Sequence, residues 1–214
     1  MGDMQVLQLD SVNVCVRSHY MPLFSRLGTY RSELIDEMAY QGLEYFEYWG
    51  HVASLVPMEM YSLFDFRRDR DWMWGSLKKV LNAQPGLAAE IEARVRSEGP
   101  VRTGDLEAPG GRTGSWWGYS ETKHVLEHLF GKGRLVTAHR RHFNRYYDTP
   151  EKVLPASVFD QPQHTTDSSY RALILSGTGA AGVGTAEDIL DWWRLNKPTG
   201  RPILANMVEE GLLQ

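Results

Sequence analysis

Apolar and polar positions in residues 112–147 alternate first with the period of a helix and then with the period of a strand. Residues 134–138 alternate like a half-buried strand, residues 142–147 alternate again, and residues 139–141 are expected to form the turn between them. A helix followed at once by a basic two-stranded ribbon is typical of the recognition helix and wing of a winged helix-turn-helix. The helix is indicated by apolar residues that repeat at the spacing of one buried face: Val125, Leu126, Leu129 and Phe130.

The residues that precede this module follow a similar order but lack its first helix. Strand-like alternation begins almost immediately. Residues 17–28 then indicate a short helix closed by Gly28, and residues 32–40 indicate an amphipathic helix. Residues 43–49 and 53–57 are expected to form two strands. This order predicts a partial winged helix at the start of the chain.

The residues that follow the module contain three predicted helices in winged-helix order. The first covers residues 167–176, the second is capped by Thr185, and the third opens at Pro202. The predicted fold class is therefore α+β and mainly helical, with three tandem winged helix-turn-helix modules of which the first and third are incomplete. We divide the chain into a partial first winged helix (1–57), a helical connector (58–84), a complete second winged helix (85–148), a linker (149–165) and a partial third winged helix (166–214).

Charge is distributed unevenly along the chain, whose formal net charge of −4 does not by itself favour nucleic-acid binding. Residues 1–111 carry 11 basic and 16 acidic side chains, residues 148–214 carry 5 and 9, and residues 112–147 carry 7 and 2. The middle segment therefore has a charge of +5, since 7 minus 2 is 5. A local positive patch on an acidic protein is expected of a surface that follows phosphates. The alternative is a solvated basic hairpin without a partner.

Composition and short motifs limit which disulfides, cellular compartments and metal sites are expected. A single cysteine, Cys15, excludes an internal disulfide framework and suits a reducing compartment. No signal peptide and no apolar run of membrane-spanning length is recognisable, so we expect a cytoplasmic, nucleoid-associated protein without a membrane partner. His124 and His128 have the spacing of a helical metal pair, but no third ligand is identifiable. We therefore expect no metal and no cofactor, and we interpret this helix surface as exposed or facing DNA.

Several idiosyncratic segments, spread over nearly the whole chain, resemble those of the winged-helix crosslink-repair DNA glycosylases of bacteria. The resemblance implies an enzyme that unhooks alkylated bases and interstrand crosslinks. Members of that family are longer, with helices before the first strand and a barrel-like domain after the third winged helix, so a gene fragment is one expectation here. The matching segments are Leu7–Val14, Arg17–Tyr20, Leu23–Gly28, Glu47–Trp49 with His51, Gly99–Arg102, Ser115–Trp117 and Arg140–Asp148.

The resemblance also implies the catalytic residues. The family signature is similar to Gln-apolar-Asp, which here is Gln8-Leu9-Asp10. On a strand, Gln8 and Asp10 project from one face while Leu9 faces the core. A carboxylate beside the sugar stabilises an oxocarbenium-like transition state or activates water, and a neighbouring amide orients that water. Family members tend to have an acidic residue where this chain has Val52, which weakens any role around His51.

The remaining expectations concern the partner, which the resemblance implies to be damaged double-stranded DNA bound by a monomer. Trp116 and Trp117 either stack on bases or wedge a duplex, or one of them fills the core of the module. Arg17 and Arg26 either bind phosphates or form ordinary salt bridges. The alternatives to a glycosylase are a non-catalytic winged-helix transcription regulator and an inactive fragment. The candidate DNA-binding residues are Arg17, Arg26, Arg112, Trp116, Trp117, Lys123, His124, Arg140, Arg141 and Arg145.

Overall fold

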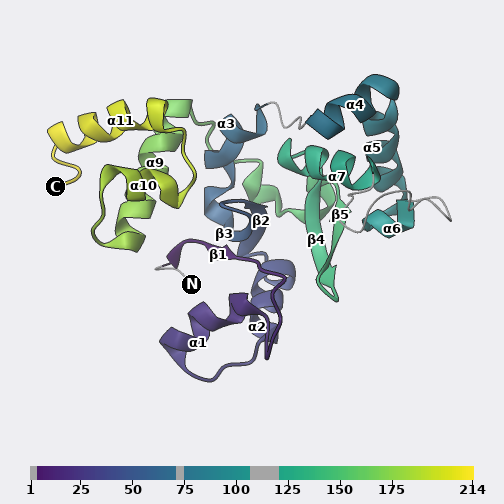
Figure 1. Cartoon of the computed structure of the whole chain (residues 1–214), viewed down its shortest axis with the longest axis horizontal. Helices are drawn as coiled ribbons and strands as arrows, with labels where there is room; N and C mark the ends of the chain where they lie inside the picture. The colour runs from purple at the N-terminus through teal and green to yellow at the C-terminus, as the bar shows by residue number, and fades with distance from the viewer. Residues whose placement is uncertain (1–3, 71–74, 107–120) are drawn as a thin grey trace. The chain divides into compact units, whose positions relative to one another are not determined.

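Helices and two small antiparallel sheets make up the computed structural model, which describes residues 4–70, 75–106 and 121–214 (Figure 1). This part of the chain is mainly helical and of the α+β class, as predicted. Contacts divide the chain into two compact units. Unit 1 comprises Met1–Phe66 and Ser157–Gln214, and unit 2 comprises Arg67–Ala156. The number of winged-helix modules stays a prediction.

The sheet of unit 1 has the order β1-β3-β2, with every neighbouring pair antiparallel. Strands β2 (Tyr45–Trp49) and β3 (Ala53–Pro57) confirm the two predicted strands. Strand β1 (Leu7–Gln8) is shorter than the alternation of the opening residues suggested. Leu7 pairs with Leu55 of the central strand, and both side chains are buried.

Helices cover this sheet on the side of the buried leucines. Helix α1 (Met21–Leu27) follows a 3-10 turn at Ser18–Tyr20 and ends at Gly28, whose φ of 76° favours glycine. Helix α2 (Glu33–Asp36) continues into a π-helical turn at Glu37–Gln41. The predicted helix over residues 32–40 is therefore confirmed, and its second half is π-helical. The residues of this core are Leu7, Leu9, Leu23, Ile35, Ala39, Tyr45 and Leu55.

The C-terminal helices of unit 1 are α9 (Thr166–Ala181), α10 (Ala186–Trp192) and α11 (Lys197–Glu209). Thr185 caps α10 as predicted, in a reciprocal capping box with Asp188. The predicted start of the last helix at Pro202 is wrong. Helix α11 begins five residues earlier because the Asn196 side chain accepts a hydrogen bond from the Thr199 amide, which leaves Pro202 inside the helix. Helix α9 also runs five residues beyond the predicted 167–176.

Residues 58–84 are mostly helical, as predicted for a connector. They form a 3-10 helix, η4 (Met58–Phe64), α3 (Asp65–Arg68) and α4 (Gly75–Ala83). The predicted linker contains more regular structure than expected, with α8 (Pro150–Val153) and η5 (Ala156–Val158). No helix in the described ranges combines the length and the apolar character that crossing a bilayer requires.

The described part of unit 2 continues with three helices and a two-stranded ribbon, the element order that the sequence predicted for a winged helix: α5 (Leu87–Glu98), α6 (Thr103–Leu106), α7 (Glu121–Gly131), β4 (Val136–Arg141) and β5 (Asn144–Asp148). The predicted buried face of α7 is confirmed, because its four apolar residues are at most 4% exposed. Val101 adds a one-residue bridge to Tyr147, with backbone hydrogen bonds in both directions. This bridge extends the two-stranded ribbon toward the helices.

The predicted turn over residues 139–141 is wrong, because those residues belong to β4. The turn is formed by His142 and Phe143, which have φ values of 49° and 66°. Two consecutive positive φ angles between paired residues are typical of a tight type I′ hairpin. The polar ends of β4 and β5 are solvated, so the hydrophobic alternation ended before the strands did.

Candidate active site and nucleic-acid interface

The Gln8-Leu9-Asp10 segment lies at the edge of the unit 1 sheet. Leu9 continues the pairing beyond β1, since its amide donates to the Ala53 carbonyl at 2.8 Å. Leu7 and Leu9 are buried, whereas Gln8 is exposed and Asp10 is half-buried. This alternation agrees with the expectation that Gln8 and Asp10 project together from the face opposite the core. The side chains are therefore accessible, and their catalytic role stays a prediction.

Two contacts hold Asp10 in place. Its Oδ1 accepts a hydrogen bond from the Val12 amide at 2.9 Å, and its backbone carbonyl lies 3.2 Å from Nδ1 of His19. Because a carbonyl can only accept, we assign the Nδ1–H tautomer to this buried histidine. Within the described part of the chain, Oδ2 of Asp10 makes no hydrogen bond. One carboxylate oxygen is fixed, and the other can receive a proton from water.

Arg17 immediately precedes the 3-10 turn that follows Asp10, and Arg26 lies on α1. Arg17 donates from Nη1 to the Ser11 carbonyl at 3.3 Å and so braces the loop that starts at Asp10. Arg26 is exposed on α1 and donates to the Pro22 carbonyl at 2.8 Å, within its own helix. No carboxylate pairs with Arg26 among the residues that the structure describes. The sequence left open whether Arg26 binds phosphate or forms an ordinary salt bridge, and the described residues contain no salt bridge to it.

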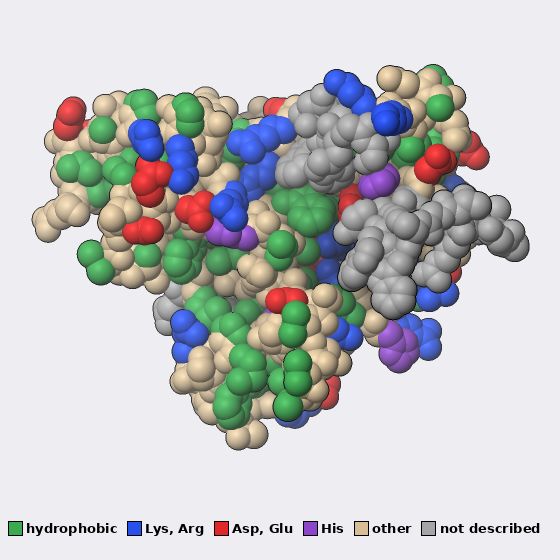
Figure 2. All heavy atoms as spheres, viewed as in Figure 1, with side chains coloured by type: hydrophobic (Ala, Val, Ile, Leu, Met, Phe, Trp, Pro, Cys, Tyr) green, Lys and Arg blue, Asp and Glu red, His purple; other side chains and the backbone are tan. Residues whose placement is uncertain are grey.

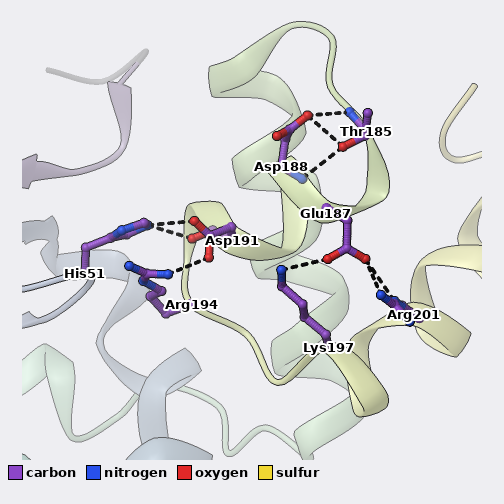
Figure 3. Close-up of polar contacts among 8 residues, drawn as sticks. All are labelled: His51, Thr185, Glu187, Asp188, Asp191, Arg194, Lys197 and Arg201. Carbon is purple, nitrogen blue, oxygen red and sulfur yellow. Dashed lines mark hydrogen bonds and ion pairs between the residues drawn. The ribbon is translucent and has the colours of Figure 1, made fainter.

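His51 occupies the turn between β2 and β3 and contacts α10 (Figure 3). Its Nε2 lies 2.7 Å from the Asp191 carbonyl and 3.7 Å from Asp191 Oδ2, and Asp191 also accepts from Arg194 at 2.8 Å. The pairing of Gln8 with Ser54, and the hydrogen bond from the Leu9 amide to the Ala53 carbonyl, place this segment beside the strand that follows the His51 turn. Sequence reasoning missed Asp191 and Arg194, since no local signal connects residues 140 positions apart.

The basic residues of α11 are already neutralised. Glu187 bridges Lys197 at 2.7 Å and Arg201 at 2.6 Å (Figure 3). Hydrogen bonds from Lys197 and then Arg201 lower the pKa of Glu187 below its ordinary value. A carboxylate that stays ionised beside both cations competes with phosphate for them. This cluster is therefore not a candidate DNA contact.

In unit 2, two arginines share one face of the β4–β5 hairpin. Arg140 is paired directly with Arg145 across the ribbon, so their side chains project from the same side. The Arg145 guanidinium lies 4.4 Å from the ring centroid of Phe130 and donates to the Tyr147 hydroxyl at 3.1 Å. The Arg140 guanidinium lies 4.5 Å from the Phe143 ring and donates to the Phe143 carbonyl at 2.8 Å. Aromatic rings thus hold both cations in fixed positions.

Lys123 adds a third positive group beside this face. Burial lowers the pKa of Lys123 from its ordinary value, and the nearby charge of Arg145 lowers it further, while Glu127 opposes the shift. The Lys123 ammonium lies 4.0 Å from the Glu127 carboxylate. Two cations close enough to affect the pKa of one of them form a positive site at the junction of α7 and the hairpin.

The remaining predicted DNA-binding residues lie partly on unit 2 and partly outside the described residues. Arg141 is exposed near the turn, and His124 is half-buried on α7. Arg112, Trp116 and Trp117 lie outside the described residues. Among residues 4–70, 75–106 and 121–214, no group of three or more His, Cys, Asp or Glu side chains is placed to hold a metal ion.

Comparisons with known proteins agree with one another. A family model described as "DNA glycosylase AlkZ-like" matches residues 1–214. Among solved structures, Streptomyces sahachiroi DNA glycosylase AlkZ is similar, with a TM-score of 0.62 and 18% sequence identity. The match covers 96% of this chain and 58% of that chain, and at this identity it shows a shared fold.

Proposed function

The chain belongs to the AlkZ-like DNA glycosylase family, and on that premise we propose that it cleaves the N-glycosidic bond of alkylated or interstrand-crosslinked bases in duplex DNA. The observation that supports the proposal most directly is Asp10, a half-buried carboxylate anchored through one oxygen beside an exposed Gln8. Since the chain spans 58% of the AlkZ chain that it matches, the activity of the longer protein is a proposal for this one.

The chemistry follows from the charge of the lesion. An N7-alkylated guanine is cationic, so when its glycosidic bond breaks, the bonding electron pair leaves with the base, which becomes neutral. Positive charge develops on the sugar at C1′, where the Asp10 carboxylate stabilises it. Water adds at C1′ and transfers a proton to Asp10, while the Gln8 amide orients that water. The products are a free base and an abasic site, and no strong general acid is needed.

The hairpin surface of unit 2 is the proposed nucleic-acid interface. Arg140, Arg145 and Lys123 form a positive face, and Arg141 extends it toward the turn. Phosphate contacts of this kind position a duplex without reading its sequence. A bound phosphate also relieves the repulsion between Lys123 and Arg145, which adds to the effect of burial on the pKa of Lys123. We further propose that residues 85–148 form a complete winged helix that holds the duplex, with partial modules before and after it.

The direct test is incubation of the chain with duplex DNA carrying an N7-alkylguanine, followed by heat or alkali. We expect more strand breaks at the lesion than in enzyme-free DNA treated in the same way, because abasic sites are labile to both treatments and N7-alkylguanine itself loses some base on heating. Binding without breaks at any enzyme concentration would leave a DNA-binding protein and remove the enzymatic proposal.

Replacing Lys123 by Met should stabilise unit 2 and weaken DNA binding. The folded state lowers the pKa of Lys123, so the unfolded chain holds this proton more tightly. Holding the charged Lys123 in the folded state costs free energy. This cost is fully present below the folded-state pKa and disappears as the pH rises to the ordinary value of 10.5, so the stability of the wild type should increase over that window. In Lys123→Met that increase should be lost, and Tm at neutral pH should rise.

Thermal unfolding and fluorescence anisotropy with duplex DNA measure the two effects of this substitution. The matched control is Lys79→Met, an exposed lysine on α4 of the same unit. A Tm that falls in Lys123→Met, or a duplex affinity equal to that of Lys79→Met, would contradict the assignment of Lys123 to the positive face.

Replacing His142-Phe143 by Asn-Gly should stabilise the hairpin and reduce DNA affinity. Left-handed backbone costs roughly 1 kcal/mol or more for a non-glycine residue, and Asn-Gly suits a type I′ turn. Losing the contact between Arg140 and the Phe143 ring offsets part of that stabilisation, so we expect a net stabilisation of about 1 kcal/mol. Without the ring that holds Arg140, affinity for duplex DNA should fall several-fold.

Denaturant unfolding and anisotropy titrations compare this double variant with His142→Asn alone, which keeps the Phe143 ring. If the double variant binds duplex DNA as tightly as the single one, Phe143 has no role in presenting Arg140 to DNA.

A further inference from the structure

The loop that follows Asp10 exposes aliphatic side chains to solvent. Val12 is 54% exposed, Val14 88% and Val16 51%, and the adjoining helix α1 exposes Phe24 and Leu27. Figure 2 shows hydrophobic side chains gathered over the part of unit 1 that carries α1. Isolated exposed apolar residues are common, but a contiguous group of them marks an interaction surface.

This loop is braced and joined to the candidate catalytic carboxylate. The Val12 amide donates to Asp10 Oδ1 at 2.9 Å, and the Ser18 amide closes the loop on the Val12 carbonyl at 3.0 Å. Asn13 and Arg17 form an antiparallel bridge across the loop. Residues 11–16 therefore form a short finger with Val14 at its tip. The hydrogen bond from the Val12 amide connects this finger to the Asp10 carboxylate.

The charge around the finger indicates which partner it fits. Residues 11–32 contain Arg17, Arg26 and Arg31 and no acidic residue, in a chain whose net charge is −4. Arg31 pairs with Glu37 at 3.3 Å, and Arg26 has no carboxylate partner among the described residues. An aliphatic tip in a segment that carries arginines and no carboxylate of its own complements a duplex, whose stacked bases are apolar and whose edges are anionic.

We propose that residues 11–16 form a wedge that enters the base stack beside the damaged base and holds Asp10 against its sugar. This inference rests on the proposed glycosylase function and adds the way in which the lesion is opened. Apolar side chains inserted between base steps partly unstack them and bend the duplex. Val14 occupies the tip, Arg17 and Arg26 contact the flanking phosphates, and insertion presses the Val12 amide toward Asp10.

The chain carries its own probe of this contact, since Cys15 is exposed at the tip and is the only cysteine. The rate at which Cys15 reacts with 5,5′-dithiobis(2-nitrobenzoate) should fall about tenfold or more when the full chain is saturated with N7-methylguanine duplex, with saturation monitored by anisotropy. An unchanged rate in the saturated complex overturns the wedge. Protection by anionic phospholipid vesicles instead of DNA, or by raising the protein concentration alone, also overturns it.

Two valines provide a matched pair of variants. Val14→Ser changes the tip, and Val183→Ser changes a residue that is 90% exposed in the connection between α9 and α10. Neither side chain is packed, so both variants should fold. With 2-aminopurine placed next to the lesion, Val14→Ser should lose the fluorescence increase that unstacking causes, and its single-turnover base release should be about tenfold slower. Val183→Ser should match the wild type in both measurements.

The two readouts separate failure of the wedge from failure of the enzyme. If the wild type releases no base yet protects Cys15 and raises 2-aminopurine fluorescence, the wedge stands and the glycosylase proposal falls. If Val14→Ser and Val183→Ser release base equally fast, with equal fluorescence, the wedge is wrong while the enzyme stands.

Discussion

Asp10→Asn should release an alkylated base at least about 100-fold more slowly than the wild type while binding damaged duplex with similar affinity. Asparagine has nearly the same shape, and its side-chain oxygen can still accept the Val12 amide, so the loop keeps its anchor. The substitution removes only the charge that stabilises the developing cation and the base that takes a proton from water. Single-turnover base release under saturating enzyme measures the chemical step.

The control for this substitution is Asp160→Asn, which removes an exposed carboxylate elsewhere in unit 1. It should release base at the wild-type rate. If Asp10→Asn also does so, the Gln8-Leu9-Asp10 segment is not the catalytic strand, and a different carboxylate must be sought.

Trp193→Ala should lower the free energy of unfolding of unit 1 by about 3–5 kcal/mol. Trp193 is fully buried at the end of α10, and its ring lies 5.6 Å from the ring of Phe64 in an edge-on contact. Phe64 in turn lies 5.6 Å from Tyr48 of β2. This chain of rings connects the C-terminal helices to the sheet, so its loss should loosen the contact between two segments that are distant in sequence.

Denaturant unfolding followed by circular dichroism measures this loss, with Phe159→Ala as the control because Phe159 is 53% exposed. The control should change stability by no more than about 0.5 kcal/mol. A loss below 1 kcal/mol in Trp193→Ala would contradict the aromatic core.

Periodicity in the sequence predicted the elements that have one apolar, buried face and one polar face. Helix α7 and strands β2 and β3 were located because each has a core that its apolar residues must reach. The wing turn was misplaced because its strands end in solvent, where no burial imposes alternation. The start of α11 was misplaced because a proline is a strong signal in sequence, whereas the Asn196 cap is decisive in three dimensions.

The candidate site was predictable in part. The alternation of Leu7, Gln8, Leu9 and Asp10 indicated which side chains share a face, and the exposures agree with it. The support of Asp10 by His19 was not predictable, since it depends on how the intervening loop folds back. The association of residues 157–214 with residues 1–66 was also missed, because it depends on a contact such as Phe64–Trp193 that leaves no local pattern.

The central claim is that this chain hydrolyses the glycosidic bond of a damaged base. Mass spectrometry of a single-turnover reaction with N7-methylguanine duplex tests it most directly, because it identifies both products. The account predicts free N7-methylguanine and abasic DNA in a one-to-one ratio, formed at a rate that increases with enzyme concentration until the duplex is saturated. Intact duplex recovered from a saturated complex, with no free base above the spontaneous background, would contradict it.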